Sequence, residues 1–146
     1  MRIEGEWLLC DDGITRPVAV VGVKAADGSL VEERFLIDSG ADRTVLSADL
    51  LTNLALPALS VSAGDALAGV GGVQSHLLVQ TALEISHDGG GTAIIRGEFA
   101  AFTDPAATDL SILGRDVLNL FDLILSRPRN DIELLAVPHC YRVGTN

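Results

Sequence analysis

The feature that most restricts the fold of this chain is a succession of short apolar segments, rich in Val, Ile, Leu and Phe, that turns interrupt. Segments of this length and composition are typical of β-strands. Gly, Asn, Asp or Pro marks the breaks between them, for example at 26–29, 87–91 and 127–130. The sequence therefore predicts strands at 17–23, 30–37, 77–85, 93–102, 121–125 and 132–137.

Only two short helices are expected, at 47–54 and at 115–120. Ser47 is a good N-cap for the first, with Asp49 in its first turn, and Gly114 precedes the second. Many strands with so little helix favour an all-β, closed or nearly closed barrel. With 146 residues and 48% hydrophobic content, the chain suits a single domain over 1–146.

Composition excludes several kinds of partner. The formal net charge is −10, and the 10 Lys and Arg residues are spread along the chain, so we expect no nucleic-acid binding. No apolar run approaches the roughly 18 residues of a membrane span, and the first residues are too acidic for a secretory signal. We therefore expect no membrane partner and a cytoplasmic location.

Cysteine and histidine give no sign of a metal site. Cys10 and Cys140 have no C-x-x-C spacing, so free thiols are the default expectation. His76, His87 and His139 lie far apart in the sequence. We expect neither a metal nor another cofactor.

Two motifs carry the chemistry. The first places Asp38, Ser39 and Gly40 directly after an apolar strand, with Asp42 four positions beyond Asp38. An Asp-Ser-Gly tripeptide alone is more often a plain turn. The second motif, at 111–118, is an apolar pair followed by Gly-Arg-Asp and an apolar helical turn, and it changes that balance.

Together the motifs resemble those of the retropepsin family, the retroviral aspartic proteases and their cellular and bacterial relatives. The resemblance implies an acid-protease-like barrel with its active site at a dimer interface. It also implies that Asp38 is catalytic and that Ser39, Gly40 and Ala41 complete the active-site loop. Because the chain has only one such motif, the second Asp must come from another copy, so a homodimeric peptidase acting on peptides or proteins is expected.

The same resemblance assigns roles to other residues. It implies an ion pair between Asp42 and Arg115 that fastens the loop to the second helix, and Arg suits this role through its bidentate geometry. It also implies a flap at the glycine-dense segment 67–74. The expected flap residues are Gly69, Val70, Gly71 and Gly72, and the expected apolar subsite residues are Leu36, Val70, Val73 and Leu113.

Two other functions remain open from the sequence. The chain could be a non-catalytic dimerisation or peptide-binding module that has kept the fold, because fold alone does not confer activity. A monomeric small-ligand binder would make the Asp-Ser-Gly loop incidental and would need an apolar cavity.

Overall fold

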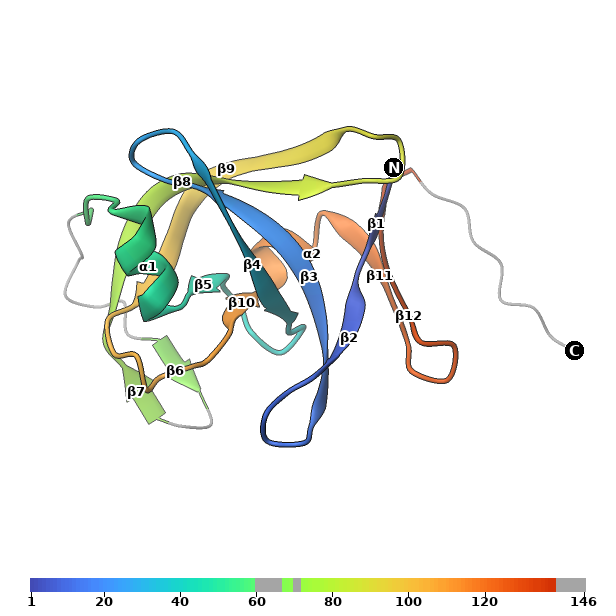
Figure 1. Ribbon diagram of the computed structural model, residues 1–146, viewed down its shortest axis with the longest axis horizontal. Coiled ribbons are helices and arrows are strands. Elements are labelled where there is room, and N and C mark those ends of the chain that lie inside the picture. The colour runs from blue at the N-terminus through green and yellow to red at the C-terminus, as the bar shows by residue number, and fades with distance from the viewer. Residues whose placement is uncertain (60–66, 70–71, 139–146) are drawn as a thin grey trace, which may run out of the picture.

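The computed structural model describes residues 1–59, 67–69 and 72–138, and strands dominate it, as the sequence predicts (Figure 1). Every predicted strand is present, with bounds that differ by at most two residues at either end. The strands are β1 (Arg2–Glu4), β2 (Glu6–Leu9), β3 (Thr15–Lys24), β4 (Leu30–Ile37), β5 (Val45–Leu46), β6 (Leu67–Gly69), β7 (Gly72–Gln74), β8 (His76–Ser86), β9 (Thr92–Phe102), β10 (Ser111–Leu113), β11 (Phe121–Ser126) and β12 (Asp131–Ala136).

The main sheet has the order β2-β3-β4-β10-β5-β9-β8, and an additional pairing of β8 with β3 closes all of these strands except β2 into a ring. The strands thus form a ring where the sequence predicts a closed or nearly closed barrel (Figure 1). The β3–β4 and β8–β9 pairs are long antiparallel hairpins, whereas β10 lies parallel to β4. This parallel pairing brings the two sequence motifs, which lie far apart along the chain, to the same end of the ring.

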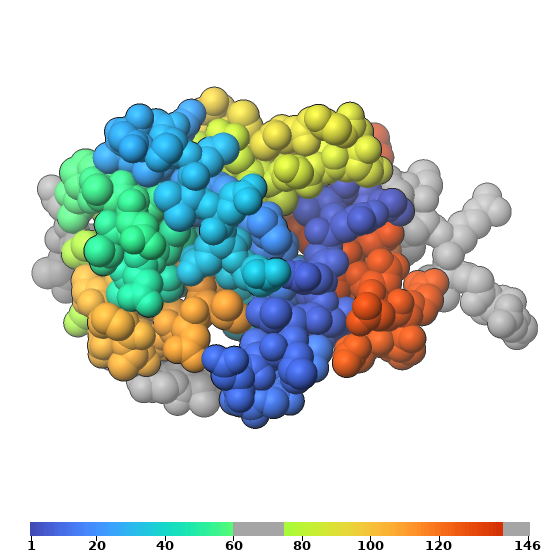
Figure 2. Space-filling model, viewed as in Figure 1, coloured from blue at the N-terminus to red at the C-terminus, as the bar shows by residue number. Residues whose placement is uncertain are grey.

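A second sheet joins the two ends of the described chain, in the order β1-β12-β11. Ile3 of β1 lies opposite Leu134 of β12, and both side chains are buried. In Figures 1 and 2 the N-terminal strands lie against the C-terminal hairpin of β11 and β12. The sequence pattern did not reveal β1 and β2, because each is too short to show a period of its own.

The core follows the alternation of each strand. On β4 the side chains of Phe35 and Ile37 are buried, while Leu36 between them is only half-buried, because successive strand residues point to opposite faces. Leu83 of β8 and Leu46 of β5 are wholly buried in the same cluster. The ring therefore encloses one main apolar core.

The two helices are as short as predicted: α1 (Ala48–Leu54) and α2 (Arg115–Leu118). Ser47 caps α1, with its Oγ accepting from the N–H of Leu50. The second helix ends two residues earlier than expected, because the chain turns directly into β11 at Phe121. No helix in the described part of the chain is long and apolar enough to cross a membrane.

Candidate active site

The first motif forms a tight loop at the end of β4. The N–H of Asp38 donates to the carbonyl of Leu113 at 3.2 Å, and the N–H of Ala41 donates back to the carbonyl of Asp38 at 3.1 Å. The N–H of Gly40 donates to Oδ1 of Asp38 at 2.9 Å. Asp38 is half-buried, whereas Ser39 and Gly40 are exposed. The loop thus fixes the Asp38 carboxylate at the surface of the ring.

The second motif lies against this loop and holds it through the backbone. The N–H of Arg115 donates to the carbonyl of Ala41 at 2.9 Å, and the N–H of Asp116 donates to the carbonyl of Asp42 at 3.3 Å. A Cβ at Gly114 would lie 2.3 Å from the carbonyl carbon of Arg43. The φ of Gly114 is −94°, which any residue can adopt, so backbone conformation does not require glycine here. The close approach of the two backbones does, because it leaves no room for a Cβ.

Thr44 and Asp116 form the polar centre of this contact. The Oγ1 of Thr44 donates to Oδ1 of Asp116 at 2.7 Å and accepts from the N–H of Gly114 at 3.0 Å. The same carboxylate oxygen accepts the N–H of Thr44 at 2.8 Å and that of Val117 at 2.9 Å. Thr44 is 0% exposed and its bond to Gly114 is buried, whereas the bonds to the exposed Asp116 are partly buried. The sequence alone did not predict this contact, and Asp116 stood out only as part of the 111–118 motif.

The structure also brings Asp42 and Arg115 together in a salt bridge. Their side chains are 79% and 51% exposed, however, and exposed ion pairs of this kind contribute about 1 kcal/mol or less. The buried bonds of Thr44 and the backbone bonds to α2 therefore hold the loop more strongly than this ion pair does.

We expect Thr44→Val to destabilise the protein more than Arg115→Lys. Valine keeps the shape of threonine but leaves the buried N–H of Gly114 without its acceptor, at a cost of about 1–3 kcal/mol. Arg115→Lys keeps the charge at an exposed site and should change the free energy of unfolding by less than about 1 kcal/mol. Urea unfolding of both variants measures the difference, and an equal or reversed order would contradict this account of the loop.

A polar cluster fastens the strands beside the loop. The Oγ of Ser111 donates to Oε2 of Glu33 at 2.5 Å and accepts from the N–H of Ser47 at 2.8 Å. The Oγ of Ser47 lies 3.3 Å from Oε1 of the same glutamate. Glu33 thus joins β4, β10 and the start of α1, which keeps the strand before Gly114 in register with the strand before Asp38.

An apolar row crosses the sheet next to Asp38. Ile112 of β10 lies opposite Leu36 of β4 and opposite Val45 of β5, and Ala100 of β9 lies opposite both Val45 and Leu78. Paired residues of neighbouring strands share a face, and this face is opposite to the one that carries the main core. Val45, Ala100 and Phe102 form a second cluster here, on which Leu78 and Ile112 pack. We call Leu36, Ile112, Val45, Ala100 and Leu78 the apolar row.

The prediction that Leu113 lines an apolar subsite is wrong. Leu113 is 0% exposed and belongs to the main core, so it cannot line a surface site. Its neighbour Ile112 points to the opposite face and lies in the row beside Leu36. An error of one residue along a strand moves a side chain to the other face, which explains the wrong choice.

The glycine-dense segment forms a hairpin of β6 and β7, in which Gly69 pairs with Gly72. Val70 and Gly71, expected at its tip, lie outside the described residues, as do His139 and Cys140. The backbone alone supports a hairpin at the place where the flap was expected. Its role as a flap stays a prediction.

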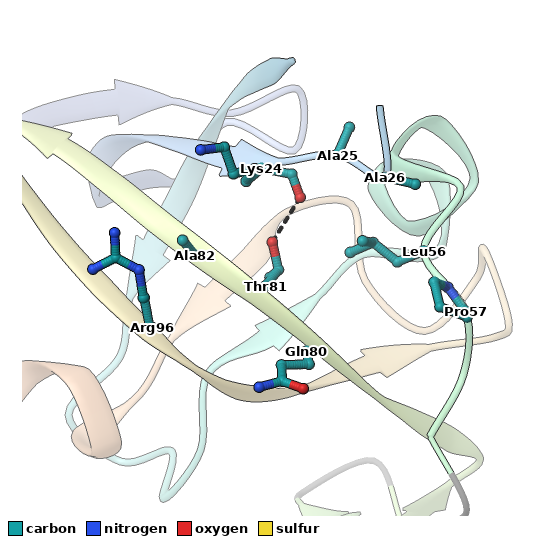
Figure 3. Close-up of a pocket in the computed structure, with 9 residues that line it drawn as sticks. All are labelled: Lys24, Ala25, Ala26, Leu56, Pro57, Gln80, Thr81, Ala82 and Arg96. Atoms are coloured by element: carbon teal, nitrogen blue, oxygen red, sulfur yellow. Dashed lines mark hydrogen bonds between the residues drawn. The ribbon is translucent and has the colours of Figure 1, made fainter. Parts of the chain in front are cut away.

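An open groove of about 470 Å³ lies elsewhere on the molecule, and Figure 3 shows its lining. It lies at the end of β3, and Arg96 of β9 is one of the residues that line it. The Oγ1 of Thr81 closes one side with a 2.6 Å hydrogen bond to the carbonyl of Lys24. None of the lining residues belongs to the two motifs, so the groove is separate from the Asp38 loop.

Comparison with known proteins gives matches in structure alone. No family model matches the chain, and no curated protein sequence does. The EIAV protease, solved with the inhibitor HBY-793, superposes with a TM-score of 0.50 and 27% identity, over 71% of this chain and 86% of that protein. A retropepsin-like aspartic protease from Rickettsia conorii superposes with a TM-score of 0.54 and 13% identity, over 92% of this chain and 90% of that one.

Both similar structures are proteases, and the second is described as a retropepsin-like aspartic protease, the kind that the two motifs indicate. The resemblance drawn from the Asp38 loop and the 111–118 motif is confirmed, because the structure pairs these segments and the same fold occurs in both proteins. The chain has the retropepsin-like fold.

Proposed function

We propose that this protein is an aspartic endopeptidase that acts as a homodimer, with Asp38 from each subunit as one of two catalytic carboxylates. The observation that supports the proposal is the fixed position of Asp38, which is half-buried directly after β4. Its loop is held in place by the contacts among Gly114, Thr44 and Asp116. A precisely held carboxylate at the surface, beside an apolar row, suits a site that a second copy completes.

The dimer gives the chemistry that one carboxylate lacks. Two carboxylates about 3 Å apart cannot both ionise, so they share one proton. The ionised member takes a proton from a bound water as that water attacks the peptide carbonyl, and the protonated member donates a hydrogen bond to the carbonyl oxygen. The proton then passes to the leaving amine, and the peptide C–N bond breaks.

The surroundings of Asp38 suit an extended peptide. The half-buried members of the apolar row, Leu36, Ile112 and Leu78, offer contact to side chains of the substrate. The β6–β7 hairpin lies between the two motifs in the sequence, where a flap would cover them. Main-chain hydrogen bonds to an added strand would hold the peptide, while alternate side chains reach the row.

The proposal is tested by digesting a random peptide library at a series of protein concentrations. We expect cleavage whose rate per subunit falls on dilution, in parallel with the loss of dimer measured by sedimentation, because a monomer holds only half of the site. A catalytically competent monomer at every concentration would contradict the shared site. Dimerisation with no cleavage would favour the non-catalytic module.

The pH dependence of the rate gives a second test. A pair that needs one ionised and one protonated carboxylate should give a bell-shaped profile of kcat/KM, with its maximum in the acidic to mildly acidic range. The rate falls at low pH as the base is protonated, and it falls at high pH as the shared proton is lost. A rate that keeps rising through neutral and alkaline pH would indicate a serine or metal mechanism instead.

A further inference from the structure

Arg43 is an exposed arginine that follows the candidate active-site loop directly. Four arginines in the described part of the chain form salt bridges: Arg2, Arg16, Arg34 and Arg115. Among residues 1–59, 67–69 and 72–138, no carboxylate lies within salt-bridge distance of Arg43. Its guanidinium charge is therefore without a partner in the described part of the chain.

The topology places Arg43 at the level of Asp38. Asp38 lies two residues beyond Leu36 on β4, and Arg43 lies two residues before Val45 on the segment that leads into β5. Residues two apart on a strand share a face; Asp38 directly follows β4, and Arg43 lies in the bend that leads into β5. Thr44, between Arg43 and Val45, is turned inward onto Asp116, which agrees with this alternation. Asp38 and Arg43 therefore both extend the face of the apolar row.

Asp38 and Arg43 also lie at the same end of the apolar row. Because β10 is parallel to β4 and antiparallel to β5, the direction beyond Leu36 is the direction before Val45. Gly114 lies between the two segments, with its Cα against the carbonyl group of Arg43. Two neighbouring strand spacings separate the backbones, which corresponds to about 10 Å. An extended peptide covers that distance in about three residues.

The carboxylates of the two motifs nearest to Arg43 in the sequence are already engaged. Asp42 pairs with Arg115, and Oδ1 of Asp116 accepts hydrogen bonds from Thr44 and Val117. Glu98 of β9, two residues before Ala100, also lies on this face, but no salt bridge joins it to Arg43 in the described part of the chain. Asp38 shares a proton with its counterpart in the proposed dimer. Arg43 is thus free to bind a carboxylate that the substrate brings.

We propose that Arg43 is a specificity-determining residue that selects peptides with a Glu or Asp side chain within about three residues of the scissile bond. This inference rests on the proposed function and names its substrate class. The half-buried Leu36 and Ile112 of the apolar row add a requirement for an apolar side chain next to the acidic one. A symmetric dimer presents Arg43 on both sides of the cleavage point, so the acidic residue is accepted on either side.

The test uses matched peptides built on a sequence that the wild-type protein cleaves, with Glu or Gln placed in turn at each of the three positions on either side of the bond. At the favoured position we expect kcat/KM to be at least tenfold higher for Glu than for Gln, the scale of one charge-assisted hydrogen bond. Arg43→Gln should remove the preference, and Arg43→Glu should reverse it. Equal rates for the two peptides, or a preference that survives in Arg43→Gln, would overturn the proposal.

The control variant is Arg96→Gln, which removes an exposed arginine of the separate groove in Figure 3. It changes the net charge as Arg43→Gln does and should keep the full preference for Glu. A loss of the preference in Arg96→Gln as well would mean that overall charge, and not Arg43, produces it. The wild-type preference should also fade as the pH drops through about 4, where the Glu side chain of the peptide becomes protonated.

A binding measurement separates this inference from the proposed activity. The Asp38→Asn protein, with and without Arg43→Gln, is titrated with the fluorescently labelled Glu and Gln peptides, or with acidic and amide members of the library if no cleavage is found. Tighter binding of the acidic peptides that depends on Arg43 supports the inference even where the peptidase proposal fails. Binding that ignores Arg43, in a protein that does cleave, overturns the inference alone.

Discussion

Asp38→Asn is expected to reduce peptide cleavage by more than about 10³-fold while the protein remains folded and dimeric. Asparagine has the shape of aspartate but can neither take a proton from water nor share one with a second carboxylate. The N–H of Gly40 can still donate to the side-chain oxygen at position 38, so the loop keeps its geometry. Steady-state cleavage and sedimentation measure both halves of this expectation.

Mixing the subunits makes the test specific for a shared site. If each active dimer needs two Asp38 side chains, then adding Asp38→Asn protein to a fixed amount of wild type should lower the activity, because mixed dimers are inactive. The activity should follow the square of the wild-type fraction at constant total protein, which is the random-pairing result for a symmetric dimer. A linear dependence would mean that one copy carries a whole site and would contradict the two-carboxylate mechanism.

Gly114→Ala is expected to destabilise the protein by about 3 kcal/mol or more and to abolish activity. The added Cβ would meet the carbonyl carbon and oxygen of Arg43 at 2.3 and 2.4 Å and the N of Thr44 at 2.8 Å. These are backbone atoms of the segment that holds the loop, so no side-chain rotation relieves the contact, and overpacking of this kind costs about 1–3 kcal/mol or occasionally more. Urea unfolding and the cleavage assay measure the two effects.

Gly22→Ala is the matched control for this variant. Gly22 lies in β3 of the same ring, and the nearest atom to its added Cβ is the carbonyl oxygen of Glu84 at 3.5 Å, an ordinary contact. We expect its stability to change by less than about 1 kcal/mol. If Gly114→Ala unfolds at the same urea concentration as Gly22→Ala, the loop and the start of α2 are not as tightly packed as the structure indicates.

The sequence predicted the local structure well because the signals are local. Alternating and apolar runs gave the long strands, and Ser47 marked the start of α1 through its capping geometry. The two motifs also identified the retropepsin-like fold, since an acid after an apolar strand and a Gly-Arg-Asp helix start are both readable from residue order. The proposed catalytic role of Asp38 rests on that order and stays a prediction.

Tertiary structure alone decided which residues meet. Thr44 is an ordinary threonine in the sequence, and it becomes the centre of the loop only because the parallel pairing of β10 with β4 brings Asp116 to it. The choice between Leu113 and Ile112 depends on strand register, and the alignment of Arg43 with Asp38 depends on the opposite directions of β4 and β5. A sequence records the residues of each strand in order, whereas register and direction between strands follow from long-range pairing and packing. These long-range pairings therefore determine which side chains surround the Asp38 carboxylate.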